Sequence, residues 1–319
     1  MVLQLTVNPR PTLPAPVRPG FSEKKLSIAI KLASKTATNQ PQAFENGSNT
    51  VTLEGHRASL RVQHAGGLAG STAQLAIWGL SQSIQDQLST LGMVIQLVPR
   101  NTITITAGDD ESGMSTVFVG IIVQAIPDFS GVPTVPFRFE LNSQAAGLAI
   151  PIPASSYTGA TDVATVLSAL AKQMGWGFEN SGVSVMLSNP YLAGSAVSAI
   201  RKVASAANVN WAVLNNVLCV WPKYGTRRGT GKPLVAPPPA GQMIGFPSYT
   251  QQGIKVSNLF DPRIVQGGQV EVRSSLKRAS GTWNVGQIDL ALDQLVPKGE
   301  WSTTAWCYNP NFPQPLPGK

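Results

Sequence analysis

The feature that most constrains the fold of this chain is a two-residue alternation of apolar and polar side chains. In residues 25–32 (KLSIAIKL) every second residue is apolar, which is typical of a strand that buries one face. The same alternation recurs in six further segments, at residues 50–55, 58–64, 73–80, 101–108, 115–126 and 135–143. The pattern predicts a mostly antiparallel sheet over residues 24–145 that curls into a barrel.

One helix is expected within this sheet region. Ser81 can cap a helix whose apolar residues Ile84, Leu88 and Leu91 share a face, and Gly92 can end it in the left-handed conformation. The sequence therefore predicts a single helix packed on the first barrel.

From Pro151 onwards the apolar spacing becomes helical. One apolar stripe ends at Gly175 and consists of Val163, Val166, Leu167, Leu170 and Met174. Strand-like segments follow at residues 176–180 and 183–187, and a second helix is expected over residues 194–209. A hairpin with Asn215 and Asn216 in its turn comes next. Two helix-then-hairpin units predict either a weak internal duplication or one compact α+β insert.

The rest of the chain is again β-rich, after a basic stretch that is rich in Gly and Pro. Strands are expected within residues 243–260, 269–276, 279–295 and 300–310, with turns at Pro262, Gly267-Gly268, Gly281 and residues 297–299. The predicted class is mainly β with an α+β insert, in which two tube-like β-barrels flank a small helix-hairpin region. The predicted parts are a Pro-rich arm (1–22), a first barrel (23–147), the insert (148–222), a linker (223–240) and a second barrel (241–319).

Composition points to surfaces that are covered by other protein. Charged residues make up 13% of the chain, and 30 glycines and 25 prolines suit strands and turns. We therefore expect an oligomer. The formal net charge is +8, but its basic residues are scattered over the arm, the first strand and the linker: Arg10, Arg18, Lys24, Lys25, Lys223, Arg227, Arg228 and Lys232. Solvated linker charge is favoured over contact with a polyanion.

No residue pattern indicates a catalytic, metal or cofactor site, and we expect no cofactor. If His56 and His64 lie on one strand, they are roughly 26 Å apart and cannot share a metal ion. No Gly-x-Ser-x-Gly elbow or phosphate-binding loop occurs, and the glycine-rich residues 63–75 suggest a flexible loop at a barrel rim. The acidic run Asp109 to Gly113 lacks the spacing of a calcium loop and suggests a solvated hairpin tip.

The remaining candidates for chemistry also favour a structural reading. Cys219 and Cys307 lie among apolar strand residues and are expected to be buried free thiols. The seven tryptophans are scattered over all regions, which favours burial in the core or in interfaces over a sugar-binding platform. A glycan hydrolase would need paired carboxylates in a cleft. The one cluster available for that role is Asp261, Asp289, Asp293 and Glu300.

The chain has no run of eighteen apolar residues, and its first residues lack the apolar core of a signal peptide. We expect a protein that is assembled in a cytoplasm, with no stable insertion into a membrane.

The last part of the chain resembles the C-terminal barrel of phage tail baseplate hub proteins, the family of the T4-type hub and of the late control protein D group. The residues that carry the resemblance are SNLFDPRIVQGGQVEVRSS (257–275) and GTWNVGQIDLALDQLVPKGEWSTTAWCY (281–308). In the first half, ITITAG (103–108), VFVGIIVQAI (117–126) and FRFELNSQA (137–145) are similar to the first tube-like barrel of that family. The chain is short for this family, which implies a minimal middle insert, and the resemblance supplies no counterpart for the arm at 1–22.

The resemblance implies a structural protein of the virion tail, not an enzyme. It implies a homotrimer whose two barrels per chain form a pseudo-sixfold ring between the tail tube and the central spike. The implied partners are the tail tube protein, the central spike protein and the tape-measure protein, with double-stranded DNA passing through the lumen. The implied place is the baseplate, assembled in the bacterial host cytoplasm. As an assembly contact we single out the turn of the last barrel: Phe260, Asp261, Pro262, Arg263 and Trp301.

Three alternatives stay open at this point. A distal tail or tube-initiator protein would show one barrel per chain in a hexameric ring. A tail-associated glycan hydrolase would bring the four carboxylates together in a cleft. A nucleic-acid-binding module would gather the basic residues on one face.

Overall fold

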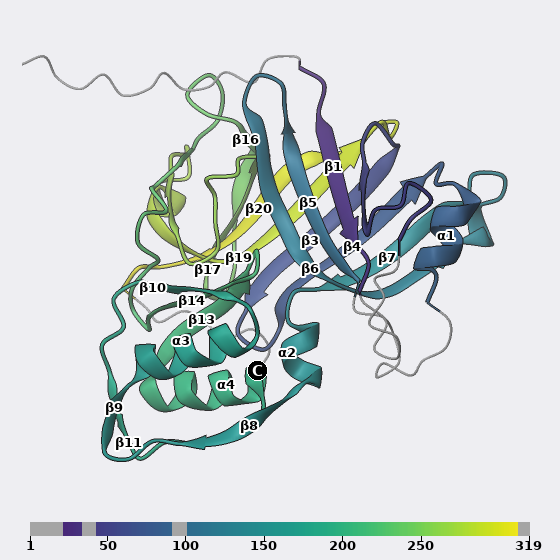
Figure 1. Ribbon diagram of the computed structural model, residues 1–319. Helices are drawn as coiled ribbons and strands as arrows, with labels where there is room; N and C mark the ends of the chain where they lie inside the picture. Colours follow the sequence, from purple (N-terminus) through teal and green to yellow (C-terminus); the bar gives the residue numbers. More distant parts are fainter. Residues whose placement is uncertain (1–21, 34–42, 91–100, 312–319) are drawn as a thin grey trace, which may run out of the picture.

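The computed structural model of the chain describes residues 22–33, 43–90 and 101–311 (Figure 1). The predicted arm lies outside these residues, apart from Ser22. The first part contains seven strands and two short helices: β1 (Lys25–Lys31), β2 (Thr50–Leu53), β3 (Ala58–Gly66), β4 (Gly70–Trp78), α1 (Gln82–Leu88), β5 (Thr102–Asp109), β6 (Gly113–Pro127), the 3-10 helix η1 (Phe129–Gly131) and β7 (Pro136–Asn142). The alternation predicted for the first strand is confirmed, because Leu26, Ile28 and Ile30 are buried.

The middle part carries two longer helices, one short helix and seven short strands. Its elements are α2 (Ala145–Ala149), β8 (Pro151–Ser156), β9 (Ala160–Asp162), α3 (Val163–Gln173), β10 (Gly177–Asn180), β11 (Met186–Ser188), β12 (Tyr191–Ser195), α4 (Ala196–Ala207), β13 (Val209–Leu214) and β14 (Val217–Pro222). Figure 1 shows α3 and α4 side by side at the lower end of the molecule, away from the large sheet.

The last part returns to strands. It contains β15 (Leu234–Val235), β16 (Met243–Tyr249), β17 (Gly253–Leu259), β18 (Gln269–Val272), the 3-10 helix η2 (Lys277–Ala279), β19 (Gly281–Gln294) and β20 (Trp301–Tyr308). The mainly β class with an α+β insert is confirmed by these elements. The domain boundaries given above stay predictions.

The first and last parts share one sheet of 13 strands. Its main path runs β16-β17-β20-β19-β3-β4-β7-β6-β5-β1-β2, with β15 and β18 attached through β19. The joint is the antiparallel pairing of β19 with β3, from Ile288 opposite His64 to Gln294 opposite Ala58. Strand β19 is 14 residues long, and its first residues pair with β18. Strand β19 can therefore pair with strands of both the first and the last part of the chain.

Two separate closed barrels are not what the described strands form. The sheet path is open between β16 and β2. Strands β1 and β19 are connected by a side chain, since the Leu26 backbone N–H of β1 donates a hydrogen bond to the side-chain oxygen of Gln294 in β19. The predicted closure into two barrels is therefore not confirmed by the pairing of the described strands.

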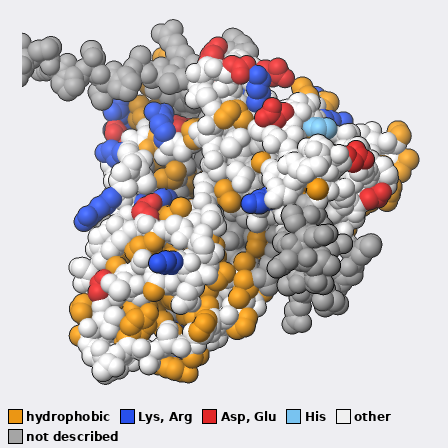
Figure 2. Space-filling model, in the orientation of Figure 1, with side chains coloured by type: hydrophobic (Ala, Val, Ile, Leu, Met, Phe, Trp, Pro, Cys, Tyr) orange, Lys and Arg blue, Asp and Glu red, His pale blue; other side chains and the backbone are white. Residues whose placement is uncertain are grey.

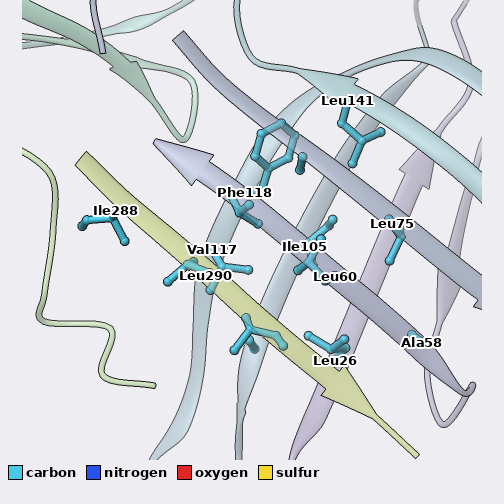
Figure 3. Close-up of a cluster of buried hydrophobic side chains, with 14 of the residues drawn as sticks. Leu26, Ala58, Leu60, Leu75, Ile105, Val117, Phe118, Leu141, Ile288 and Leu290 are labelled. Atoms are coloured by element: carbon cyan, nitrogen blue, oxygen red, sulfur yellow. The ribbon is translucent and has the colours of Figure 1, made fainter. Parts of the chain in front are cut away.

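One hydrophobic core underlies this continuous sheet. Figure 3 shows Ile288 and Leu290 of β19 among side chains of the first part, including Leu60, Leu75 and Ile105. A second core lies in the insert, between α3, α4 and the three-stranded sheet β10-β14-β13. In the described part of the chain, no helix is long and apolar enough to cross a membrane.

The predicted caps and turns agree with the structure at several points. Ser81 caps α1 and accepts a hydrogen bond from the Ile84 N–H, while Leu91 and Gly92 lie outside the described residues. Asn215 and Asn216 both have positive φ, 48° and 64°, in the turn between β13 and β14, as a two-residue hairpin turn requires.

Two local predictions in these regions are wrong. Residues 176–180 and 183–187 do not form a hairpin, because β10 pairs in parallel with β14 and β11 pairs with β9. Strand β10, which follows α3, thus joins the sheet of β13 and β14, which follow α4. The two predicted units therefore form one compact insert. Residues 63–75 are a tight hairpin, not a flexible loop, since the Gly67 N–H donates to the carbonyl of Trp211 in the insert at 2.9 Å.

Candidate assembly site

The turn between β17 and β18 is stiffened by its own side chains. The Asp261 carboxylate accepts a hydrogen bond from the Arg263 backbone N–H at 2.9 Å and three more from the Arg263 guanidinium, at 2.9, 3.2 and 2.7 Å. The hydrogen bonds from Asp261 raise the pKa of Arg263. Pro262 presets the backbone angle of the turn, and both Pro262 and Arg263 are exposed. The turn therefore presents a cation to solvent on a fixed backbone.

An aromatic pair supports the turn from behind. The rings of Phe260 and Trp301 meet edge to face, with centroids 5.9 Å apart and planes at 79°. The Phe260 N–H also donates to the Trp301 carbonyl at 3.1 Å. Both side chains are half-buried against the large core. The structure thus brings all five predicted contact residues together, with Pro262 and Arg263 outward and the aromatic pair inward.

A cavity of about 240 Å³ lies behind this turn. Its walls come from the turn itself, from β3, β6 and β19, and from β10, β13 and β14 of the insert. The charged residues that line it are Asp261, Glu179 and Arg227. The cavity therefore marks the junction at which the three parts of the chain meet.

Arg227 is the residue that connects the three parts at this junction. Its guanidinium donates to both carboxylate oxygens of Glu179, at 2.9 and 2.7 Å, and to the Gln266 carbonyl at 3.2 Å. Its backbone N–H donates to the Gly267 carbonyl at 2.8 Å. Burial alone would lower the pKa of Arg227, but the hydrogen bonds to Glu179 outweigh it and raise that pKa, and the same bonds lower the pKa of Glu179.

The prediction of solvated charge in residues 223–240 is wrong for Arg227, whose side chain is 13% exposed. In the same stretch, β15 pairs in parallel with β18 and Val235 is fully buried. Hydrogen bonding to Glu179 and burial of Val235 hold this segment against the sheet. It is therefore part of the packed structure.

The glycines of the turn are required by close packing. Gly267 has φ 76°, and a Cβ at this position would lie 2.9 Å from the Arg227 Cδ and 3.0 Å from a ring carbon of Trp221. The left-handed backbone and the close contacts both favour glycine over any residue with a Cβ.

The histidines and cysteines are structural in this fold. His64 is buried between the Ser71 hydroxyl, 2.8 Å away, and the Val117 carbonyl, 3.1 Å away, and burial lowers its pKa to about 4. His56 lies before the start of β3, so the two histidines do not share a strand. Cys219 and Cys307 are buried free thiols, as predicted, and burial raises the pKa of each to about 12. Among the described residues, no group of three or more His, Cys, Asp or Glu could hold a metal ion.

The four carboxylates considered for hydrolysis do not converge. Asp261 lines the junction cavity, whereas Asp289 and Glu300 line a groove on the solvent face of the sheet. Asp293 is paired with Arg61 at 2.7 Å. The four carboxylates thus do not form one cluster, and Asp289 and Glu300 are the two that share a groove.

The acidic hairpin tip is more ordered than expected. Asp109 is buried and accepts from the Lys24 ammonium at 2.6 Å, while the exposed Asp110 pairs with Lys25. Burial would raise the pKa of Asp109, but hydrogen bonds from Lys24 and Ser112 outweigh it and hold that pKa well below its usual range. The base of β1 is therefore fastened to the β5–β6 hairpin.

Sequence reasoning did not find Glu179, Arg227 and Gln266 as junction residues. Glu179 is one of few charged residues in the insert, and that isolation was the one available signal. This signal does not identify the residue that Glu179 contacts, because the contact between Glu179 and Arg227 depends on the parallel pairing of β10 with β14.

Comparison with known proteins identifies relatives of this architecture. A family model described as Baseplate hub gp41 matches residues 32–294. The fold is similar to the 43 kDa tail protein of prophage MuSo2 from Shewanella oneidensis, with a TM-score of 0.59, 9% identity, and coverage of 90% of this chain and 99% of that one. The tail protein from Neisseria meningitidis MC58 gives a TM-score of 0.59 at 8% identity, covering 89% and 96% of the two chains.

A third similar structure is the E. coli c3393 protein, with a TM-score of 0.54, 10% identity, and coverage of 90% of this chain and 80% of that one. It is described as a component of the type VI secretion system with structural similarity to the T4 bacteriophage tail proteins gp27 and gp5. No curated protein matches the sequence significantly.

Proposed function

Because the chain belongs to the Baseplate hub gp41 family, a family of phage tail structural proteins, we propose that it assembles as a homotrimer between the tail tube and the central spike. In this proposal each chain contributes two tube-like parts, and the threefold axis turns them into a pseudo-sixfold ring. The tube protein, the spike protein and the tape-measure protein are its partners, and DNA passes through the lumen. The chain acts in the baseplate without catalysis, after assembly in the host cytoplasm.

The observation that carries the proposal is the continuous sheet. The pairing of β19 with β3 fixes the first and last parts of the chain side by side, over a common core. Two parts joined in this way cannot rotate freely, so each chain can present both parts to a ring in one orientation. A rigid pair of parts is what a ring with two units per chain requires.

The surface of the insert supports contact with other subunits. Large apolar side chains are exposed there, with Leu148 at 47%, Met186 at 57% and Tyr191 at 57%. Figure 2 shows that hydrophobic and uncharged side chains dominate the lower end of the molecule, whereas most of the charged side chains lie higher up. Depletion of charge with exposed Tyr and Met is typical of protein interfaces.

The first test is the mass of the purified protein by light scattering, combined with negative-stain images along the symmetry axis. We expect a trimer with six lobes in the end view. A hexameric ring with one lobe per chain would refute the trimer and support the tube-initiator alternative.

The turn at Pro262 is tested by charge reversal. We expect Arg263→Glu, alone or with Phe260→Ala, to weaken trimer formation and incorporation into virions. Arg273→Glu is the matched control, because Arg273 also pairs with a carboxylate two residues away, at 2.8 Å, and its side chain is 64% exposed. If both arginine variants assemble equally well, the turn is not an assembly contact.

A further inference from the structure

The solvent face of the large sheet, opposite the core, has no covering layer among the described residues and is hollowed into a groove. The groove has a volume of about 620 Å³ and is lined by side chains from β3, β4, β6, β7, β19 and β20. Polar residues of these strands, such as Gln63, Gln74 and Asn142, form part of its lining. A hollow that crosses several strands is suited to an extended segment of chain.

The groove carries unbalanced negative charge. Glu140, Asp289 and Glu300 line it, and none of them has an ion-pair partner among the described residues. Arg61 is the cation of the lining, and it is already paired with Asp293 at 2.7 and 3.0 Å. An occupant that carries positive charge would therefore be favoured over a polyanion.

A fixed tryptophan lies at one end of the groove. Trp306 is 37% exposed, and its indole N–H donates to the Asp289 carboxylate at 2.7 Å. It lies two residues beyond Thr304, which lines the groove. The ammonium group of Lys255 lies 4.9 Å from the ring centroid and covers part of the ring. The exposed remainder offers a flat apolar surface beside a carboxylate.

The first 21 residues of this chain have the chemistry that matches this face. They contain five prolines, the cations Arg10 and Arg18, and no Asp or Glu. Proline-rich segments favour the polyproline II conformation, and such segments dock in grooves lined by aromatic side chains. Arginines that flank the prolines can pair with carboxylates along the groove.

The arm starts within reach of the groove. It enters the described structure at Ser22, just before β1, and the Leu26 N–H is bonded to Gln294 at the end of β19. At the same end of the sheet, the Asp293 N–H bonds to the carbonyl of Glu300. Four strand spacings separate β20 from β7, about 19 Å. Eight residues of polyproline II, the separation of Arg10 from Arg18, span about 25 Å.

From the groove, its charge and the starting point of the arm, we propose that residues 1–21 lie along this face of their own chain. In the bound arm, prolines pack against Trp306 while Arg10 and Arg18 pair with the carboxylates of the groove. This inference does not depend on the trimer, because one chain supplies both the groove and its occupant.

The proposal can be tested in the full-length protein by photo-cross-linking. Leu13, in the middle of the arm, is replaced by benzoylphenylalanine, and the protein is irradiated and digested for mass spectrometry. We expect cross-links to residues of β7, β19 or β20, in a product that runs at the mass of one chain. Cross-links to other surfaces, or the absence of cross-links, would overturn the proposal. A product at twice the mass would show that the arm docks on another copy and would equally overturn it.

Charge variants separate docking from chance proximity. We expect Glu140→Gln combined with Glu300→Gln to reduce the yield of the cross-link roughly 2- to 10-fold, as the loss of two exposed ion pairs would. The matched control is Glu54→Gln combined with Glu111→Gln, which removes two exposed carboxylates elsewhere and should leave the yield unchanged. Equal yields in the two double variants would refute the charge pairing. Asp289 is left intact because it positions Trp306.

Discussion

Replacing Arg227 by methionine tests whether the three parts of the chain are held together at the junction. The variant keeps most of the length of the side chain but removes the two hydrogen bonds to Glu179 and the one to the Gln266 carbonyl. Breaking a buried ion pair costs about 3–5 kcal/mol. Because Glu179 is one-third exposed and water can partly replace its partner, we expect a loss of about 2–3 kcal/mol in the free energy of unfolding.

The assay is urea unfolding followed by tryptophan fluorescence, since the buried Trp221 packs at the same junction. A double-mutant cycle with Glu179→Gln isolates the pair, and we expect a coupling energy of about 1–2 kcal/mol. Arg273→Met is the control, because its pair with Glu271 is exposed and should contribute less than about 0.5 kcal/mol. A loss below about 0.5 kcal/mol for Arg227→Met, or full additivity in the cycle, would refute the reasoning.

The same pair has a defined pH dependence. Hydrogen bonding to Arg227 lowers the pKa of Glu179 in the folded protein. The contribution of the ion pair to the free energy of unfolding is therefore complete above the pKa of Glu179 in the unfolded state, near 4.3. This contribution is lost as the pH falls through the lower pKa of Glu179 in the folded state. In Arg227→Met, the loss of stability between pH 5 and pH 3 should be smaller than in the parent protein.

Three further predictions concern buried groups. His64, with its pKa lowered to about 4, should contribute a loss of stability as the pH falls from about 6.5 to 4, of the order of 3 kcal/mol, since the unfolded state takes up the proton first. Unfolding of His64→Asn at pH 7 and pH 4.5 should show a smaller difference than in the parent protein, and an unchanged difference would contradict this. Gly267→Ala should lower the thermal midpoint markedly, because the left-handed backbone costs about 1–2 kcal/mol and the added Cβ meets Arg227; a midpoint within 1 °C of the parent protein, about the precision of the scan, would count against it. Cys219 and Cys307, each with its pKa raised to about 12, should react with a thiol reagent at pH 8 only after unfolding, and rapid labelling of the native protein would show that they are accessible.

Local patterns predicted much of the fold because they report on single elements. The alternation of Leu26, Ile28 and Ile30 identifies a strand with one buried face, and Ser81 and Asn215 identify a cap and a turn. Each of these signals depends on neighbours within a few residues. The strand and helix content was therefore accessible without the structure.

Pairings between distant segments could not be predicted in this way. Nothing in residues 288–294 specifies β3 as a neighbour, because an alternating strand can pair with any complementary edge. No local pattern in the sequence indicates the parallel pairing of β10 with β14 either. The contact between Arg227 and Glu179 depends on that pairing, so it was missed along with it. The predicted turn at Phe260 to Arg263 was found because its residues are close in sequence.

The pairing of β19 with β3 also has a consequence for synthesis on the ribosome. Ser59 and its partner Asp293 are separated by 234 residues. At a translation rate of about 5–20 residues per second, the edge of β3 stays unpaired for roughly 10–50 s before β19 has been synthesised. During that interval the nascent first part exposes unpaired backbone groups that can pair with other chains. Slower elongation or a shortage of chaperones should therefore reduce the yield of this protein by aggregation of incomplete chains.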